Sequence, residues 1–152
     1  MSSDRLKLEL FSDEDGTAEL QVSVRAGAFS GESSAWFGME QLRAFASALT
    51  AFPLGEEARR GIVGGTWAFQ EPNKLEQVFV AISAYPINTR GGLGVRTRVA
   101  TRTDRYERPE SVNTAEVELK TTYSALARFL AQFALLLDCR AQEAVLLTDE
   151  TT

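Results

Sequence analysis

The sequence predicts a two-layer α+β fold, in which a mainly antiparallel sheet of about six strands carries two helices on one face. Three observations support this prediction. Several short segments alternate apolar and polar residues, which is typical of strands with one buried face. Two longer segments show the apolar period of an amphipathic helix, and each directly follows an expected strand. The length of 152 residues suits a single domain over residues 1–152, with a frayed acidic tail from about residue 148.

The beginning of the chain predicts two or three strands. Leucines at positions 6, 8 and 10 alternate with charged residues, and residues 20–24 repeat this two-residue period. Residues 13–16 read Asp-Glu-Asp-Gly, which favours a hairpin turn because glycine tolerates a positive φ. We therefore expect an antiparallel pair, followed by a short third strand that carries Trp36 and Phe37.

Four further strands are expected in the second half of the chain. Residues 54–60 are polar and are expected to form a loop. Residues 61–70 follow as a strand in which the pair Gly64 and Gly65 indicates a bulge or a close backbone approach. The other three expected strands are residues 78–84, 93–103 and 115–119.

Two helices are expected, at residues 39–52 and 122–140, and a short apolar segment at 144–147 follows the second helix. Pro53 stops the first helix. The second is the most apolar segment of the chain, so we expect it to organise the fold and to be covered on most of its circumference, by a sheet on one side and another part of the chain on the other. It is too short for a membrane span and has a charge at its middle. Its clearly polar residues form one narrow stripe: Ser124, Arg128 and Gln132.

The composition argues against most kinds of chemistry. The chain contains no histidine, which is the commonest general base and transition-metal ligand. Its single cysteine, Cys139, excludes an intrachain disulfide and a thiolate-cluster metal site. We therefore expect a cytoplasmic protein without enzymatic activity, with no catalytic, cofactor-binding or metal-binding residues and no cofactor. The net charge of −5 argues against a general nucleic-acid binder.

A pair of carboxylates leaves one catalytic alternative open. Glu116 and Glu118 stand about 7 Å apart on one face of an expected strand, and a hydrolase can work with two acids in a cleft. Arg96, Arg98 and Arg102 lie on what should be the neighbouring strand. Ion pairs across the two strands explain both sets of charges without any chemistry.

A concentration of arginines gives the candidate binding site. Six of the chain's 16 basic residues fall within residues 90–108. Guanidinium groups bind carboxylates and phosphates, so this segment could dock an acidic partner or a phosphate. Only one aromatic residue lies among them, which disfavours stacking on nucleic acid. The candidate partner-binding residues are Arg90, Arg96, Arg98, Arg102, Arg105, Tyr106 and Arg108.

Residues 20–52 carry a family resemblance. They read as a strand, the tripeptide 29–31, a short strand with Trp36, and the pattern Leu42-x-x-Phe45-x-x-x-Leu49 before a proline. This arrangement resembles the opening of WapI-type immunity proteins, which are small bacterial proteins. The resemblance implies a non-catalytic cytoplasmic protein that neutralises a toxin by binding it, without a cofactor.

Self-association is the alternative function. Phe129 and Leu136 are expected to project away from the most apolar side of the last helix, where they could line a homodimer seam. The sequence thus predicts a protein partner or a second copy of the chain, and neither a nucleic acid nor a membrane.

Overall fold

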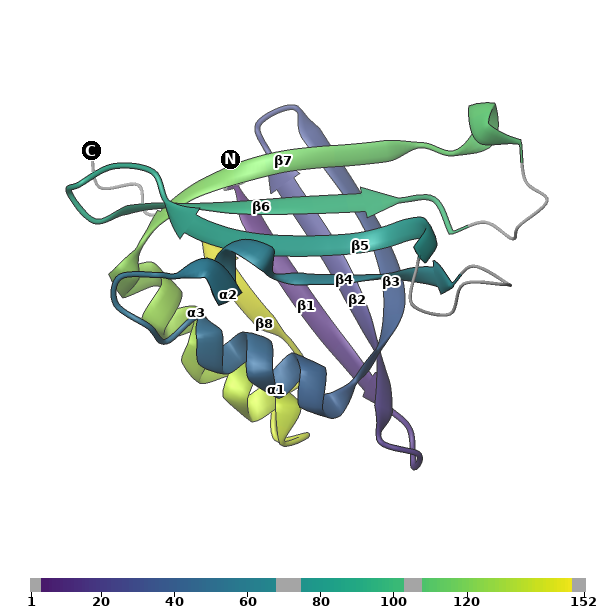
Figure 1. The fold of residues 1–152 in the computed structure, drawn as a ribbon, viewed down its shortest axis with the longest axis horizontal. Helices are drawn as coiled ribbons and strands as arrows, with labels where there is room; N and C mark the ends of the chain where they lie inside the picture. Colours follow the sequence, from purple (N-terminus) through teal and green to yellow (C-terminus); the bar gives the residue numbers. More distant parts are fainter. Residues whose placement is uncertain (1–3, 68–74, 103–107, 149–152) are drawn as a thin grey trace.

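The computed structural model describes residues 4–67, 75–102 and 108–148, and Figure 1 shows its fold. Two candidate partner-binding residues, Arg105 and Tyr106, lie outside the described residues, and so does the expected tail beyond residue 148. The elements follow in the order β1 (Arg5–Ser12), β2 (Thr17–Ala26), β3 (Phe29–Gly38), α1 (Met39–Ala48), α2 (Glu56–Arg60), β4 (Ile62–Trp67), β5 (Leu75–Pro86), β6 (Gly92–Ala100), the 3-10 turn η1 (Pro109–Ser111), β7 (Thr114–Thr122), α3 (Tyr123–Leu137) and β8 (Ala144–Leu147).

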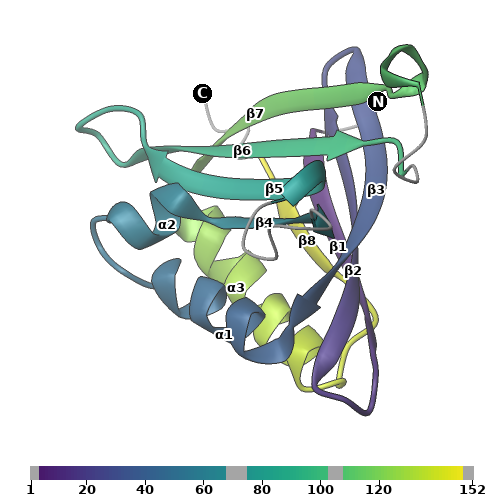
Figure 2. The same cartoon turned by 45° about the vertical axis from the view of Figure 1, so that its right-hand side comes forward.

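The strands form two antiparallel sheets, ordered β3-β2-β1-β8 and β4-β5-β6-β7. The α+β class and the antiparallel pairing are confirmed, but the single sheet of about six strands is wrong. The chain leaves β3 for α1 and α2 before it re-enters a strand, and β4 then pairs with β5 alone. Figures 1 and 2 show the two sheets crossing at a steep angle, as orthogonally packed sheets do.

The first sheet begins with the expected hairpin. Gly16 has a φ of 85°, in the region that favours glycine, and closes the turn between β1 and β2. Its carbonyl accepts a hydrogen bond from the Met39 backbone N–H at 2.9 Å. The turn is therefore tied to the start of α1. The apolar segment at 144–147 forms β8, which pairs with β1 at the edge of this sheet.

The second sheet contains the predicted glycine bulge. The pairing between β4 and β5 shifts its register between Gly64 and Gly65. A Cβ on Gly65 would lie 1.8 Å from the carbonyl oxygen of Gln77, so the backbone approach requires glycine here.

Helices α1 and α3 close the open side between the crossed sheets (Figures 1 and 2). The side chain of Phe133 is fully buried at the centre of this layer. Its ring lies 6.5 Å from the ring of Phe45 on α1 and 5.7 Å from that of Phe129, centroid to centroid. Aromatic pairs at such distances add to the stabilisation from burial. The last helix therefore packs against a sheet and a second helix together.

The predicted homodimer seam through Phe129 and Leu136 is wrong. The two side chains are only 3% and 2% exposed within a single chain, so neither reaches the surface. The reason is that the buried face of α3, which packs against β8, α1 and β1, includes both residues, whereas Ala127, Ala131 and Ala134 are exposed. The large apolar residue that α3 does expose is Leu135, at 42%.

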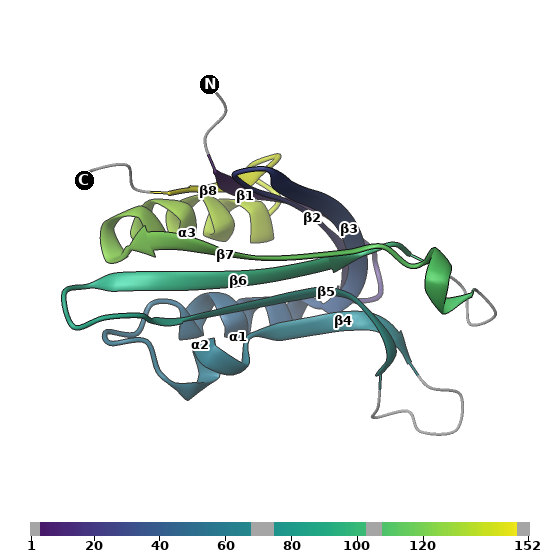
Figure 3. The ribbon, with the colours of Figure 1, turned by 90° about the horizontal axis from the view of Figure 1, so that it is seen from above.

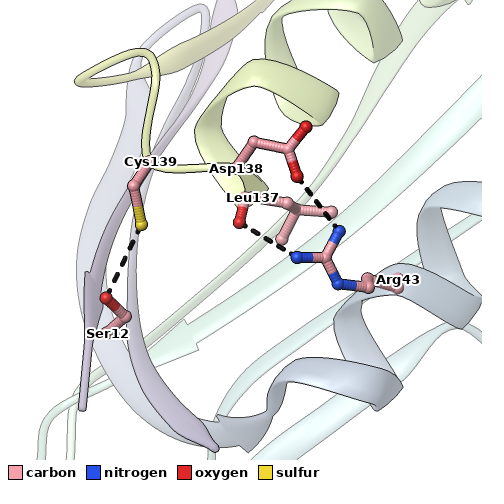
Figure 4. Close-up of polar contacts among 5 residues, drawn as sticks. All are labelled: Ser12, Arg43, Leu137, Asp138 and Cys139. Carbon is pink, nitrogen blue, oxygen red and sulfur yellow. Dashed lines mark hydrogen bonds and ion pairs between the residues drawn. The ribbon is translucent and has the colours of Figure 1, made fainter. Parts of the chain in front are cut away.

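Both ends of α3 are capped. At the first turn, the Thr122 hydroxyl accepts a hydrogen bond from the Ala125 N–H at 3.2 Å. Arg43 of α1 reaches the other end, where it donates to the Leu137 carbonyl and to the Asp138 carboxylate, each at 3.3 Å (Figure 4). These contacts satisfy backbone groups that a helix end leaves unpaired and fix α1 against α3.

The chain leaves α3 through a left-handed residue. Cys139 has a φ of 59°, and its N–H bonds the carbonyl of Leu136 at 3.1 Å. The next N–H, from Arg140, bonds the carbonyl of Leu135 at 2.8 Å. This is the Schellman arrangement, which glycine usually occupies. It ends the helix at residue 137, earlier than the predicted residue 140.

None of the helices in the described ranges combines the length and apolar character that a membrane crossing requires.

Candidate functional site

The outer face of the second sheet carries two rows of charged residues. One row pairs Arg98 of β6 with Glu116 of β7, and the next pairs Arg96 with Glu118. Residues directly opposite each other on neighbouring strands share a face of the sheet. The structure thus brings Arg96 and Arg98 together with the two glutamates, as the alternation along both strands indicated, but not Arg102.

The ion pairing does not follow these rows. The Nε of Arg96 lies 3.3 Å from an oxygen of Glu116, which is a diagonal neighbour. Glu118, directly opposite Arg96, instead accepts a hydrogen bond from the hydroxyl of Tyr85 on β5. Arg98 makes no hydrogen bond or ion pair within residues 4–67, 75–102 and 108–148. One of the two arginines is therefore bound to the sheet and the other is free.

The segment expected as a polar loop supplies two more arginines. Residues 56–60 form α2, with acidic residues in the first turn and Arg59 and Arg60 in the last. The helix ends at Gly61, whose φ is 64° and whose Cβ, if present, would lie 1.8 Å from the Ile82 carbonyl oxygen. This close approach seats α2 beside β5, as the three ribbon views show (Figures 1, 2 and 3).

Packing of α2 beside β5 brings its arginines to the charged rows. The guanidinium carbon of Arg59 lies 5.1 Å from the centre of the Tyr85 ring, within the range of a cation–π contact. Arg60 makes no hydrogen bond, ion pair or ring contact with another described residue. Helix α2 thus contributes Arg59, which contacts the Tyr85 ring, and Arg60, which has no partner among the described residues.

We call the resulting depression the arginine cleft. Its volume is about 100 Å³. Val63, Ala81 and Ser83 are among the residues that line it. Four arginines and one glutamate also line it, although the chain as a whole carries a net charge of −5. The charged residues that line it are Arg59, Arg60, Arg96, Arg98 and Glu116.

The charges of the cleft are fixed over the physiological pH range. Hydrogen bonds to Tyr85 and then to Glu116 raise the pKa of Arg96 above its already high usual value. Burial, followed by the hydrogen bond to Glu118, raises the pKa of Tyr85 above 10.0, so its hydroxyl remains a donor. Arg96 therefore keeps its charge and Tyr85 its proton at neutral pH.

The other predicted arginines lie elsewhere. Arg102 crosses to the first sheet, where it lies 2.8 Å from Glu19 and 3.0 Å from the Ser34 hydroxyl. Arg108 pairs with Glu110 at 2.8 Å beside η1. Arg90 is exposed in the turn between β5 and β6, at the end of β6 opposite to Arg102.

Of the predicted site, the arginine cleft thus contains Arg96 and Arg98. It also contains Arg59 and Arg60, which sequence reasoning missed. A signal was present in the sequence: Glu-Glu-Ala-Arg-Arg between two glycines has the charge order that a helix dipole favours. What the sequence could not show is that this short helix packs beside β5, where its arginines join those of β6 in one cleft.

The carboxylate pair is also in place. Glu116 is held by Arg96, and Glu118 by the hydroxyl of Tyr85. Neither is the unpaired carboxylate that the hydrolase alternative needs. In the part of the chain that the structure describes, no group of three or more histidine, cysteine, aspartate or glutamate side chains could hold a metal ion.

An apolar groove lies apart from the arginine cleft, between the end of α1 and the first turns of α3. It has a volume of about 560 Å³. Phe52, 80% exposed, stands at its rim, and its ring packs edge-on against Tyr123 with the centroids 4.7 Å apart. The walls include Leu130 and Ala131.

Comparison of the chain with protein-family models, with curated proteins and with solved structures finds no match. The resemblance of residues 20–52 to WapI-type immunity proteins therefore stays a prediction.

Proposed function

We propose that this chain is a non-catalytic binding domain that captures an acidic protein partner at the arginine cleft. The observation that carries the proposal is the free state of Arg60 and Arg98 among the described residues, on helix α2 and on the central strand β6. Arginines without a carboxylate partner retain their capacity for charge-assisted hydrogen bonds to another molecule.

The charge distribution supports a docking role. A positive cleft attracts an acidic patch, while the net charge of −5 on the whole chain disfavours the approach of an acidic partner to its other surfaces. Arginine is also among the residues that most often dominate the energy of protein interfaces. A solvated sheet face without a binding role would be expected to pair its charges across the strands.

The nature of the partner comes from the family resemblance. The WapI-like pattern of residues 20–52 supports an immunity protein that neutralises a bacterial toxin by direct binding in the cytoplasm. An acidic surface on that toxin would then occupy the arginine cleft. A polymorphic toxin gene beside the gene for this chain would support the proposal, and its absence would overturn the toxin part of it.

Charge reversal tests the binding surface. The double variant Arg60→Glu/Arg98→Glu should lose capture of the toxin encoded in the neighbouring gene, because two attractive contacts become repulsive. Arg90→Glu is the matched control, since Arg90 is exposed but lies in the β5–β6 turn away from the cleft. Unfolding by urea should show that the double variant keeps its stability. Equal capture by the double variant and the wild type would refute the arginine cleft as the docking surface.

Self-association remains the second candidate, at a different place from the predicted seam. The apolar groove with the exposed Phe52 could accept the same region of a second copy. Sedimentation velocity of the wild type and of Phe52→Ser decides this. A dimer that is lost in the variant would support self-association, and a wild-type monomer at micromolar concentration would remove it.

A further inference from the structure

We infer that the arginine cleft is an oxyanion site that Tyr85 keeps open, with Arg60 and Arg98 as the binding residues and Tyr85 as their positioning residue. The inference rests on the proposed function, because it specifies which chemical group of the partner enters the cleft.

The register between β6 and β7 alone would favour two direct ion pairs. Arg98 stands opposite Glu116, and Arg96 stands opposite Glu118. Opposite charges directly across an exposed antiparallel pair attract each other and normally pair. Two such pairs would neutralise all four side chains. The sheet face would then offer no free guanidinium group.

In the structure, Tyr85 takes the place of the arginine in one of these pairs. Its hydroxyl donates a hydrogen bond to Glu118, and Arg96 lies close enough to the Tyr85 oxygen for each group to shift the pKa of the other. Glu118 is therefore occupied by a neutral donor. Arg96, held at Tyr85, makes its ion pair with the diagonal Glu116 at 3.3 Å.

Arg98 has no ion-pair partner among the described residues. Its opposite residue, Glu116, makes its ion pair with Arg96 instead. The Tyr85 ring also holds Arg59, at 5.1 Å from its guanidinium carbon. Tyr85 thus fixes two of the four arginines and leaves the other two for a ligand.

The size and chemistry of the arginine cleft define that ligand. Its volume of about 100 Å³ accommodates one small anionic group. Guanidinium groups present paired N–H donors that match two oxygens of a carboxylate or a phosphate. Because the partner is proposed to be an acidic protein, the occupant is the carboxylate of an aspartate or glutamate side chain. Inorganic phosphate shares the chemistry and serves as the comparison.

The experiment follows the side-chain Nε–Hε signals of the arginines by NMR. Sodium glutarate and, separately, sodium phosphate are added to the full chain at constant ionic strength. Saturable shifts at Arg60 and Arg98, without a comparable shift at Arg90, support the site. Tighter binding of glutarate than of phosphate supports the carboxylate, and the reverse order overturns that assignment. Shifts that do not saturate, or that are equal at Arg90, would overturn the site itself.

The Tyr85→Phe variant tests the role of the hydroxyl. It removes no charge and keeps all four arginines, yet it should weaken glutarate binding about tenfold because Arg96 returns to Glu118 and Glu116 becomes available to Arg98. Adding Glu118→Gln should restore the affinity, because position 118 then carries no charge and Arg96 keeps its ion pair with Glu116. Adding Glu40→Gln instead makes the same change of charge on α1 and should not restore it.

Unchanged affinity in Tyr85→Phe, or equal rescue by both second substitutions, would overturn the positioning role. Melting curves of each variant separate this role from loss of folding. The two proposals can fail separately. Glutarate binding without toxin capture would refute the proposed function alone, and toxin capture without a saturable oxyanion site would refute this inference alone.

Discussion

Replacing Phe133 by alanine removes the most deeply buried large side chain of α3. Phe133 is fully buried, and its ring contacts those of Phe45 and Phe129 at centroid distances of 6.5 and 5.7 Å. Truncating a buried phenylalanine costs about 3–5 kcal/mol, from lost burial and the cavity left behind. Two ring contacts disappear together, so we expect a value in the upper half of that range. A domain of this size has only about 5–15 kcal/mol of stability in total.

Urea denaturation followed by fluorescence and by circular dichroism measures this loss. Leu135→Ala on the same helix is the control, because that side chain is 42% exposed and its truncation should cost less than about 1 kcal/mol. If Phe133→Ala costs no more than Leu135→Ala, then α3 does not hold the two sheets and α1 together as described.

Three further predictions concern single positions. Cys139→Gly should raise the free energy of unfolding by roughly 0.5–1 kcal/mol, because glycine adopts the left-handed φ of 59° without strain; a lower value in urea denaturation would contradict this. Gly61→Ala should lower the melting temperature and weaken glutarate binding together, since a Cβ there would lie 1.8 Å from the Ile82 carbonyl oxygen and displace α2; a fully wild-type variant would show that α2 is not seated by this contact. The pKa of Tyr85 is raised above 10.0 by burial and then by its bond to Glu118, so the protonated phenol stabilises the folded state: this contribution is complete below pH 10.0 and is lost as the pH rises through the folded-state pKa. Tyr85→Phe should flatten this part of the stability–pH curve, and identical curves for the two proteins would contradict the assignment.

Local periodicity was enough to predict most of the strands. The alternation at residues 6–10, 20–24 and 115–119 corresponds to β1, β2 and β7, and the glycine pair at 64–65 is a bulge. Local periodicity could not predict which strands pair with each other. An alternating segment shows which of its faces is buried but not which strand lies beside it, so the division into two sheets could not be predicted. The short segment 144–147 becomes a strand only because β1 offers it an edge.

The buried face of α3 is not the one that its sequence indicated, since Ala127 and Ala134 are exposed while Leu136 is buried. A narrow polar stripe suggests which side faces water, but which residues are buried depends on where the surrounding elements pack. Because β8 returns along α3, Phe129 and Leu136 are enclosed within one chain. The predicted dimer seam failed for that reason.

Half of the arginine cleft could be predicted. Strand alternation placed Arg96 and Arg98 on one face opposite two glutamates, as the structure confirms. The free state of Arg98 depends on Tyr85, whose hydroxyl occupies Glu118 from a third strand. No spacing within β6 or β7 contains that information. The approach of α2 likewise depends on a backbone contact between residues 61 and 82, which are distant in the sequence.

The central claim is that Arg60 and Arg98 give this acidic chain a positive docking site. The most direct test is the affinity for a fluorescent oligoglutamate peptide over a series of salt concentrations, measured by anisotropy for the wild type and for Arg60→Gln/Arg98→Gln. The account predicts saturable wild-type binding that weakens steeply with salt, and weaker binding with a shallower salt dependence in the double variant. Identical affinities and salt slopes for the two proteins would contradict it.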